Sequence, residues 1–187
     1  MAESNPIRVG IVGLGRAGWG MHCRELADRP DTFRVVAACD LIAQRRAMAA
    51  ERFACPTFRK VADLVAHHDV ELVSIATRTC DHLAHARLVL EAGKDVLVEK
   101  PMCPTYDEAR RLVVLARRLG RRLLVKQNRR FEPGFQHVRE IMAEGLLGRV
   151  HEIQLRRVGF KRRDDWQTFL RFGGGILSNW GAHILDH

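Results

Sequence analysis

The residues with the clearest chemical meaning form a glycine-rich turn near the start of the chain. Gly13-Leu14-Gly15-Arg16-Ala17-Gly18 matches the pattern G-x-G-x-x-G between an apolar run and a stretch of helical character. In that context the first glycine permits a tight turn, the second lets a pyrophosphate approach the backbone, and the third lets the helix pack on the strand. The helix N-terminus adds N–H groups and partial positive charge for phosphates. We therefore expect six residues to bind a dinucleotide, the alternative being a turn that serves the fold alone: Gly13, Leu14, Gly15, Arg16, Ala17 and Gly18.

An acidic residue completes this pattern. Asp40 ends the next apolar run. It follows Gly18 by roughly 20 residues, which is the distance expected of an acid that binds the ribose. Its carboxylate can accept hydrogen bonds from both hydroxyls of an adenosine ribose and would repel a 2′-phosphate. The sequence therefore favours NAD as cofactor, with NADP as the alternative. Arg45 and Arg46 follow on the next expected helix, and we expect them to face solvent.

Two further segments contain residues that could carry chemistry. Lys100, in Glu99-Lys100-Pro101, follows an apolar run, and ligands of a doubly wound sheet bind beyond the carboxyl ends of its strands. Pro101 favours an extended backbone at Lys100, although the tripeptide alone is better explained by a lysine in a surface turn. His183 and His187 have the i, i+4 spacing of metal ligands, but without an H-E-x-x-H pattern or nearby cysteines we expect no metal site.

The elements that must position these residues alternate between strand and helix. Apolar runs predict strands, with a brief extended piece at 55–58, over residues 7–12, 33–39, 70–76, 96–98 and 123–126. Helical character separates them at 16–29, 41–53, 61–67, 81–92 and 105–120. Thr105 and Glu108 have the spacing of a capping box, and Gly93 and Gly120 are expected to end helices. This order predicts an α/β fold, a doubly wound parallel Rossmann sheet with both faces covered.

After Lys126 the pattern changes. We expect a helix over 133–145, a longer strand over 150–158, an irregular stretch over 160–172 and a helix from Ile176. The predicted domains are 1–127, which binds NAD(P), and 128–187. Because a lone strand leaves its edges unpaired, we expect the residues after about 130 to be poorly stabilised.

Composition narrows the class of protein. The 187 residues are 47% hydrophobic and carry a formal charge of +9. No nucleic-acid-binding motif accompanies that charge, so nucleic-acid binding is not expected. No apolar run has the length of a membrane span, the start lacks the pattern of a signal peptide, and the five cysteines form no C-x-x-C pair. These features predict a cytoplasmic protein without membrane association.

Longer motifs resemble a known family. The run from Leu90 to Pro101 looks like the signature of the Gfo/Idh/MocA oxidoreductases. His82 precedes it, and 128–133, 145–150 and 173–183 resemble later motifs of that family in the same order. The resemblance thus covers essentially the whole chain. It implies a Rossmann domain followed by an α/β (α+β) domain with an open sheet, for substrate binding and oligomerisation, of which residues 128–187 are expected to be the incomplete, truncated start.

The resemblance implies hydride exchange between a nicotinamide and a secondary alcohol carbon of a sugar, cyclitol or related polyol. Lys100 is then expected to touch the reacting oxygen and the nicotinamide edge, and His183 to carry the proton. Imidazole titrates near neutral pH, and an ammonium stabilises a developing alkoxide, so both roles are chemically reasonable. The expected cofactor-binding residues beyond the glycine turn and Asp40 are Ala76, Thr77, His82, Glu99, Lys100 and Pro101.

One position departs from the family pattern. Asn179 stands four residues before His183, where the family often has an aspartate. On an α-helix these two residues share a face, but a neutral amide stabilises an imidazolium less than a carboxylate does. We therefore expect Asn179 to take part in catalysis with a weaker base, a different proton route or a distinct group of substrates.

Other functions stay open from the sequence. Redox-assisted glycosidase or epimerase chemistry would use NAD only transiently, and a non-catalytic sensor or interaction module would bind the dinucleotide without turnover. Fold alone does not choose among these functions. We also expect the full-length protein to form a homo-oligomer.

Overall fold

The computed structural model describes residues 5–160 and 162–187 of the chain. The chain divides into two compact units, Met1–Lys126 and Gln127–His187. Within the described residues, no helix combines the length and the apolar character that crossing a membrane requires.

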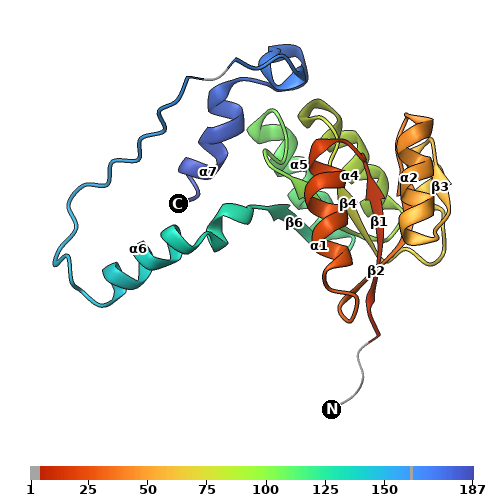
Figure 1. Cartoon of the computed structure of the whole chain (residues 1–187), viewed down its shortest axis with the longest axis horizontal. Coiled ribbons are helices and arrows are strands. Elements are labelled where there is room, and N and C mark those ends of the chain that lie inside the picture. Colours follow the sequence, from red (N-terminus) through yellow and green to blue (C-terminus); the bar gives the residue numbers. More distant parts are fainter. Residues whose placement is uncertain (1–4, 161) are drawn as a thin grey trace. The chain divides into compact units, whose positions relative to one another are not determined.

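The first unit is built on a six-stranded parallel sheet with the order β3-β2-β1-β4-β5-β6 (Figure 1). Its strands are β1 (Ile7–Val12), β2 (Phe33–Cys39), β3 (Thr57–Phe58), β4 (Leu72–Ile75), β5 (Asp95–Glu99) and β6 (Leu123–Lys126). The chain adds β2 and β3 on one side of β1 and then β4, β5 and β6 on the other side. This reversal creates a switch point beside β1, where doubly wound sheets bind their ligands. The predicted Rossmann fold is confirmed.

Helices cover both faces of this sheet. They are η1 (Gly18–Cys23), α1 (Arg24–Ala27), α2 (Ala43–Phe53), α3 (Val61–Val65), η2 (Thr79–Asp81), α4 (His82–Glu91) and α5 (Tyr106–Arg118). On one face, Val9 and Ile11 of β1 pack with Cys23 and with Ala49 of α2. On the opposite face, the strands pack against α3, α4 and α5. Figure 1 shows α2 beside β3, which is an edge strand of this sheet.

The first helix differs from the prediction of a regular α-helix over 16–29. It runs from Arg16 to Ala27, and its central part, Gly18–Cys23, is π-helical. A π turn closes i→i+5 hydrogen bonds and therefore shifts the directions of the side chains that follow. This change in side-chain direction determines which side of the helix faces the sheet at His22. The His22 side chain is buried.

Helix ends in the first unit follow the sequence signals. The Thr105 side chain accepts a hydrogen bond from the Glu108 backbone N–H, and the Glu108 carboxylate accepts one from the Thr105 N–H. Gly93 and Gly120 have φ values of 71° and 62°, in the left-handed region that favours glycine after a helix. The capping box and both glycine ends are confirmed.

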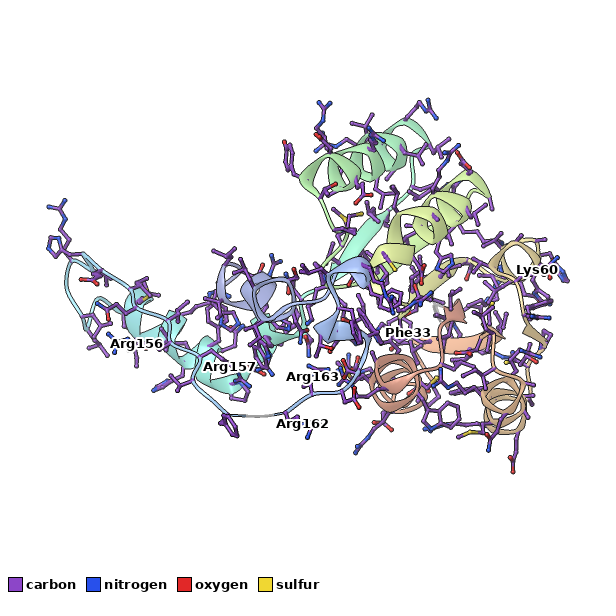
Figure 2. All side chains as sticks on the ribbon, turned by 90° about the horizontal axis from the view of Figure 1, so that it is seen from above. Phe33, Lys60, Arg156, Arg157, Arg162 and Arg163 are labelled. Atoms are coloured by element: carbon purple, nitrogen blue, oxygen red, sulfur yellow. The ribbon has the colours of Figure 1, made fainter. Side chains whose placement is uncertain are left out.

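The second unit consists of short helical elements joined by coil. These are η3 (Asn128–Phe131), α6 (Pro133–Ala143), η4 (Trp166–Thr168), η5 (Leu170–Phe172), η6 (Leu177–Gly181) and α7 (Ala182–Ile184). The predicted strand over 150–158 is wrong, because this segment is exposed coil (Figure 1). Its β-type residues have no neighbouring strand in the described part of the chain, and a strand without a partner gains no ladder hydrogen bonds. Figure 2 shows Arg156 and Arg157 on this segment.

Polar and aromatic contacts connect the second unit internally. The Gln127 side-chain amide donates to the Ala182 carbonyl at 3.0 Å. The Arg157 guanidinium lies 3.3 Å from the centre of the Trp180 ring, and that of Arg129 lies 4.5 Å from it. These contacts hold η3 and the coil against the C-terminal helical turn.

Candidate functional site

The glycine turn between β1 and the first helix has the geometry of a phosphate cradle. Gly13 has a φ of +90°, and a Cβ there would lie 2.9 Å from the Ala76 carbonyl group. A Cβ on Gly18 would lie 1.8 Å from the Gly13 carbonyl oxygen, so only glycine permits this close approach of helix and turn. Above Gly15 the space is open except for the Arg45 guanidinium, 3.7 Å from a built Cβ. The three glycines therefore fit a dinucleotide pyrophosphate at the helix N-terminus.

The other residues of the turn have different surroundings. Leu14 is buried in the core, and its backbone N–H donates to Asp40 Oδ2 at 2.7 Å. Arg16 is exposed, and Ala17 is partly buried. Leu14 thus supports the turn through its backbone, whereas Arg16 lies at its solvent side.

Asp40 lies directly beside the glycine turn, at the carboxyl end of β2. Its side chain is 8% exposed, and Oδ1 accepts a hydrogen bond from the Ile42 N–H at 2.8 Å. Together with the bond from Leu14, this fixes the carboxylate in one orientation. A carboxylate has about four acceptor positions, so the two bonds leave capacity for ribose hydroxyls.

The expectation that Arg45 and Arg46 face solvent is wrong. Arg45 Nη1 lies 3.5 Å from Asp40 Oδ2, and Arg46 Nη1 donates to the Asp40 carbonyl at 2.8 Å. Both side chains are long enough to reach back from α2 over the end of β2. Arg45 therefore places a positive charge next to the acid that was expected to exclude a 2′-phosphate.

A buried histidine joins the ends of β4 and β5. His82 is 1% exposed, with Nδ1 2.9 Å from the Pro101 carbonyl oxygen and Nε2 3.2 Å from that of Thr77. Burial lowers the pKa of His82, although the two carbonyls oppose this shift. A neutral imidazole has one N–H, so it donates to one carbonyl at a time. Ala76 and Thr77 also contact Gly13, which brings both residues to the turn.

Glu99 takes part in a buried polar cluster that the sequence analysis missed. His22 Nε2 lies 2.9 Å from Glu99 Oε1, and His22 Nδ1 lies 2.5 Å from Ser74 Oγ. Burial raises the pKa of Glu99, but the His22 hydrogen bond and the charges of His22, Lys100 and Lys126 lower it further, so the net shift is downward. A serine inside an apolar strand and a histidine in the first helix were the available signals.

The residues expected to perform the chemistry belong to different units. Lys100 follows β5 in the first unit, is partly buried and precedes Pro101 through a cis peptide bond. Asn179 lies in η6 and His183 in α7 of the second unit, where His183 is 6% exposed and its ring centre is 5.8 Å from that of Trp180. Because η6 is π-helical, the α-helical spacing assumed for Asn179 and His183 does not apply across it.

A histidine cluster elsewhere has the composition of a metal site. Within residues 5–160 and 162–187, His67, His68 and Asp69 bring three candidate ligand atoms within 4.8 Å of one another. Arg8 Nη1 lies 3.6 Å from Asp69 Oδ1, and Lys94 Nζ donates to the His67 carbonyl at 3.1 Å. Two neighbouring cations oppose the binding of a metal ion there.

The fold and the turn together define a dinucleotide-binding domain of the Rossmann class. Residues 7–127 match the family described as "Oxidoreductase family, NAD-binding Rossmann fold", Gfo/Idh/MocA. The chain belongs to this family.

Relatives with named activities are similar to this chain over most of its length. It is 39% identical over 182 residues to inositol 2-dehydrogenase of Rubrobacter xylanophilus, covering 95% of this chain and 48% of that protein. It is 30% identical over 187 residues to D-glucoside 3-dehydrogenase of Escherichia coli, covering 98% and 53%. The crystal structure of an NAD-binding protein from Listeria innocua superposes with a TM-score of 0.81 at 30% identity, covering 96% of this chain and 53% of that one. The chain thus spans about half the length of these proteins.

Proposed function

We propose that the protein is an NAD(P)-dependent oxidoreductase that transfers a hydride between nicotinamide and a secondary alcohol carbon of a sugar, cyclitol or related polyol. The observation that carries this proposal is the open space above Gly15 with the Asp40 carboxylate anchored beside it. The named activities of the inositol and glucoside dehydrogenases support the substrate class. These relatives give no support to glycosidase or sensor functions.

The cofactor would be held at the carboxyl end of the sheet. Its pyrophosphate would lie over Gly15 at the start of the first helix, with Asp40 accepting from the adenosine ribose. The anchored carboxylate favours NAD, while Arg45 provides a counter-charge through which NADP can also bind. Ala76, Thr77, His82 and Pro101 would shape the nicotinamide end, with His82 acting through the two carbonyls that it contacts.

Three residues would carry the chemistry. A bound nicotinamide supplies the hydride acceptor for oxidation of the alcohol. The Lys100 ammonium would stabilise the negative charge that develops on the alcohol oxygen, and His183 would accept the hydroxyl proton. Asn179 would take part in catalysis as a neutral residue at the position where the family often has an aspartate. This arrangement predicts a base that is less strongly supported than one with an aspartate at the same position.

The test is a titration of the chain with NADH, following nicotinamide fluorescence. We expect saturable binding that Gly15→Val weakens by about tenfold or more, because the side chain fills the phosphate position. Gly20→Val is the matched control, since Gly20 is exposed and a Cβ there meets nothing within 4 Å. Equal loss in both variants, or no binding by a folded sample, would contradict the proposed cradle.

The cofactor preference has its own test. Asp40→Asn keeps an oxygen that can accept from the Leu14 N–H but removes the negative charge. We expect this variant to weaken NADH binding and to strengthen NADPH binding, and Arg45→Ala to weaken NADPH binding selectively. Tighter binding of NADPH than of NADH by the unaltered chain would overturn the preference for NAD.

A further inference from the structure

Three buried polar side chains meet on the face of the sheet that the first helix covers. His22 is 2% exposed, Ser74 of β4 is 1% exposed and Glu99 of β5 is 8% exposed. The neighbours of Ser74 and Glu99 in their strands, Ile75 and Val98, belong to the apolar core of the opposite face. Apolar residues would fill this space at lower desolvation cost, so the polar cluster calls for an explanation beyond packing.

The hydrogen bonds of the cluster connect its three side chains to the backbone of Lys100. A carboxylate only accepts, so His22 Nε2–H donates to Glu99 Oε1. His22 Nδ1 shares a hydrogen bond with Ser74 Oγ, accepting as a neutral ring and donating as an imidazolium. The second carboxylate oxygen, Glu99 Oε2, accepts from the backbone N–H of Lys100 at 3.2 Å. The chain of bonds thus runs from β4 through the first helix to the backbone of Lys100.

A second contact attaches the same helix to the same edge of the sheet. Lys126 of β6 is the register partner of Glu99 and forms an ion pair with Glu25 of α1, one turn after His22. The helix that begins at the glycine turn is therefore connected to the ends of β5 and β6 by two polar contacts. A displacement of this helix would be transmitted to Glu99, and through Glu99 to Lys100.

We propose that His22 is a positioning residue that couples the dinucleotide-binding helix to Lys100 through Glu99. This inference rests on the proposed function, because it assigns a role in the same site. His22 keeps the Glu99 carboxylate directed at the Lys100 backbone N–H. The negative charge of Glu99 then lies next to Lys100.

Removal of the His22 donor should change the charge state of this pair. A buried carboxylate that loses a hydrogen bond favours its neutral form. The Lys100 ammonium would then lose a neighbouring negative charge, and a larger fraction of Lys100 would be the reactive free amine. His22→Gln retains an amide N–H for Glu99, so it should preserve most of the effect that His22→Leu removes.

The experiment measures amine labelling of Lys100 in the 187-residue chain at fixed pH, by mass spectrometry of its peptides. Lys60, which is exposed and lies elsewhere on the first unit, serves as the internal reference (Figure 2). We expect labelling of Lys100 relative to Lys60 to be about three- to tenfold faster in His22→Leu, close to the unaltered rate in His22→Gln, and fastest in Glu99→Gln. His68→Leu is the matched control at a histidine whose side chain is 87% exposed.

A second measurement tests the coupling to the cofactor site. NADH should slow labelling of Lys100 in the unaltered chain and in His22→Gln, but less so in Glu99→Gln and His22→Leu. Unchanged Lys100 labelling in folded Glu99→Gln and His22→Leu samples, or equal changes in His68→Leu, would overturn the role of His22. Labelling without cofactor does not depend on NADH binding, so failure of the proposed function would appear separately, as an absence of any NADH effect on the unaltered chain.

Discussion

The two units of the chain differ in how they bury apolar side chains. Across the described residues, every buried hydrophobic side chain lies between Val9 and Ala116, in the first unit. In the second unit many large apolar residues are exposed and the others are only partly buried, and Val158 and Phe160 reach 91% and 106% exposure. The first unit therefore has a core of its own, whereas the second is held by contacts such as the Arg157–Trp180 stacking. The residues proposed to bind the cofactor therefore lie in a unit that has its own hydrophobic core.

Limited proteolysis should show the largest contrast between the units. Trypsin is expected to cut first around Arg156 and Arg157, and a fragment containing residues 5–126 should survive about a hundredfold longer, because cleavage inside a core requires unfolding. Fragment masses over time measure this, and chymotrypsin, which can cut at exposed Phe160, checks that the result does not depend on the protease. Equal lifetimes of the two units would remove the contrast.

Truncation of a leucine should have very different effects in the two units. Leu64 is fully buried between α3 and the sheet, so Leu64→Ala is expected to cost about 2–5 kcal/mol of unfolding free energy. Leu147 is 59% exposed, and Leu147→Ala should change stability by about 0.5 kcal/mol or less. Urea unfolding followed by circular dichroism compares them. A similar cost at both positions would mean that Leu147 is buried in solution.

Acid should weaken the first unit through His82. Burial holds the pKa of His82 below its ordinary value of 6.5, so below that pH the unfolded chain binds the proton more readily than the folded chain. Stability should therefore fall as the pH decreases from about 6.5, until the folded His82 is itself protonated. We expect His82→Asn to make this dependence shallower in urea midpoints at pH 7.5 and 5.5. His137→Asn, at an exposed ring of the second unit, is the control, and an unchanged slope in His82→Asn would reject the assignment.

Helix caps provide the smallest contrast. Thr105 caps α5 with a full capping box, and Thr105→Ala should cost about 1 kcal/mol. Glu132 precedes α6 without a side-chain cap bond, so Glu132→Ala should leave overall unfolding nearly unchanged. Both variants are compared by thermal unfolding, and a larger effect at Glu132 would show that α6 contributes to the cooperative transition.

The sequence predicted most of the first unit because its signals are local. Apolar runs gave the strands, and Thr105, Gly93 and Gly120 marked helix ends at the observed positions. The strand over 150–158 was wrong because its pattern describes a propensity, while a strand also needs a partner that the described chain does not offer. The strand propensity of a segment therefore predicts a strand correctly only where neighbouring strands are present to pair with it.

The backbone of the candidate site could be predicted from the sequence, whereas several of its side-chain contacts could not. The roles of Gly13 and Gly18 follow from spacing, and the structure shows the close approaches that they permit. The position of the Arg45 guanidinium depends on the length of its side chain, and the position of His22 depends on a π turn. A periodic sequence pattern shows neither of these two features. The contacts with Asp40 and Glu99 therefore required coordinates.

The hydrogen bond from Leu14 to Asp40 has a consequence for engineering of cofactor use. Asp40 supports the glycine turn and, in the proposed site, would also recognise the ribose, so the two properties should change together when the residue is replaced. A substitution to alanine would remove the acceptor for a buried N–H and loosen the turn for either dinucleotide. A redesign toward the phosphorylated cofactor should therefore begin with a residue that retains a side-chain oxygen at position 40, and only then vary the arginines around it.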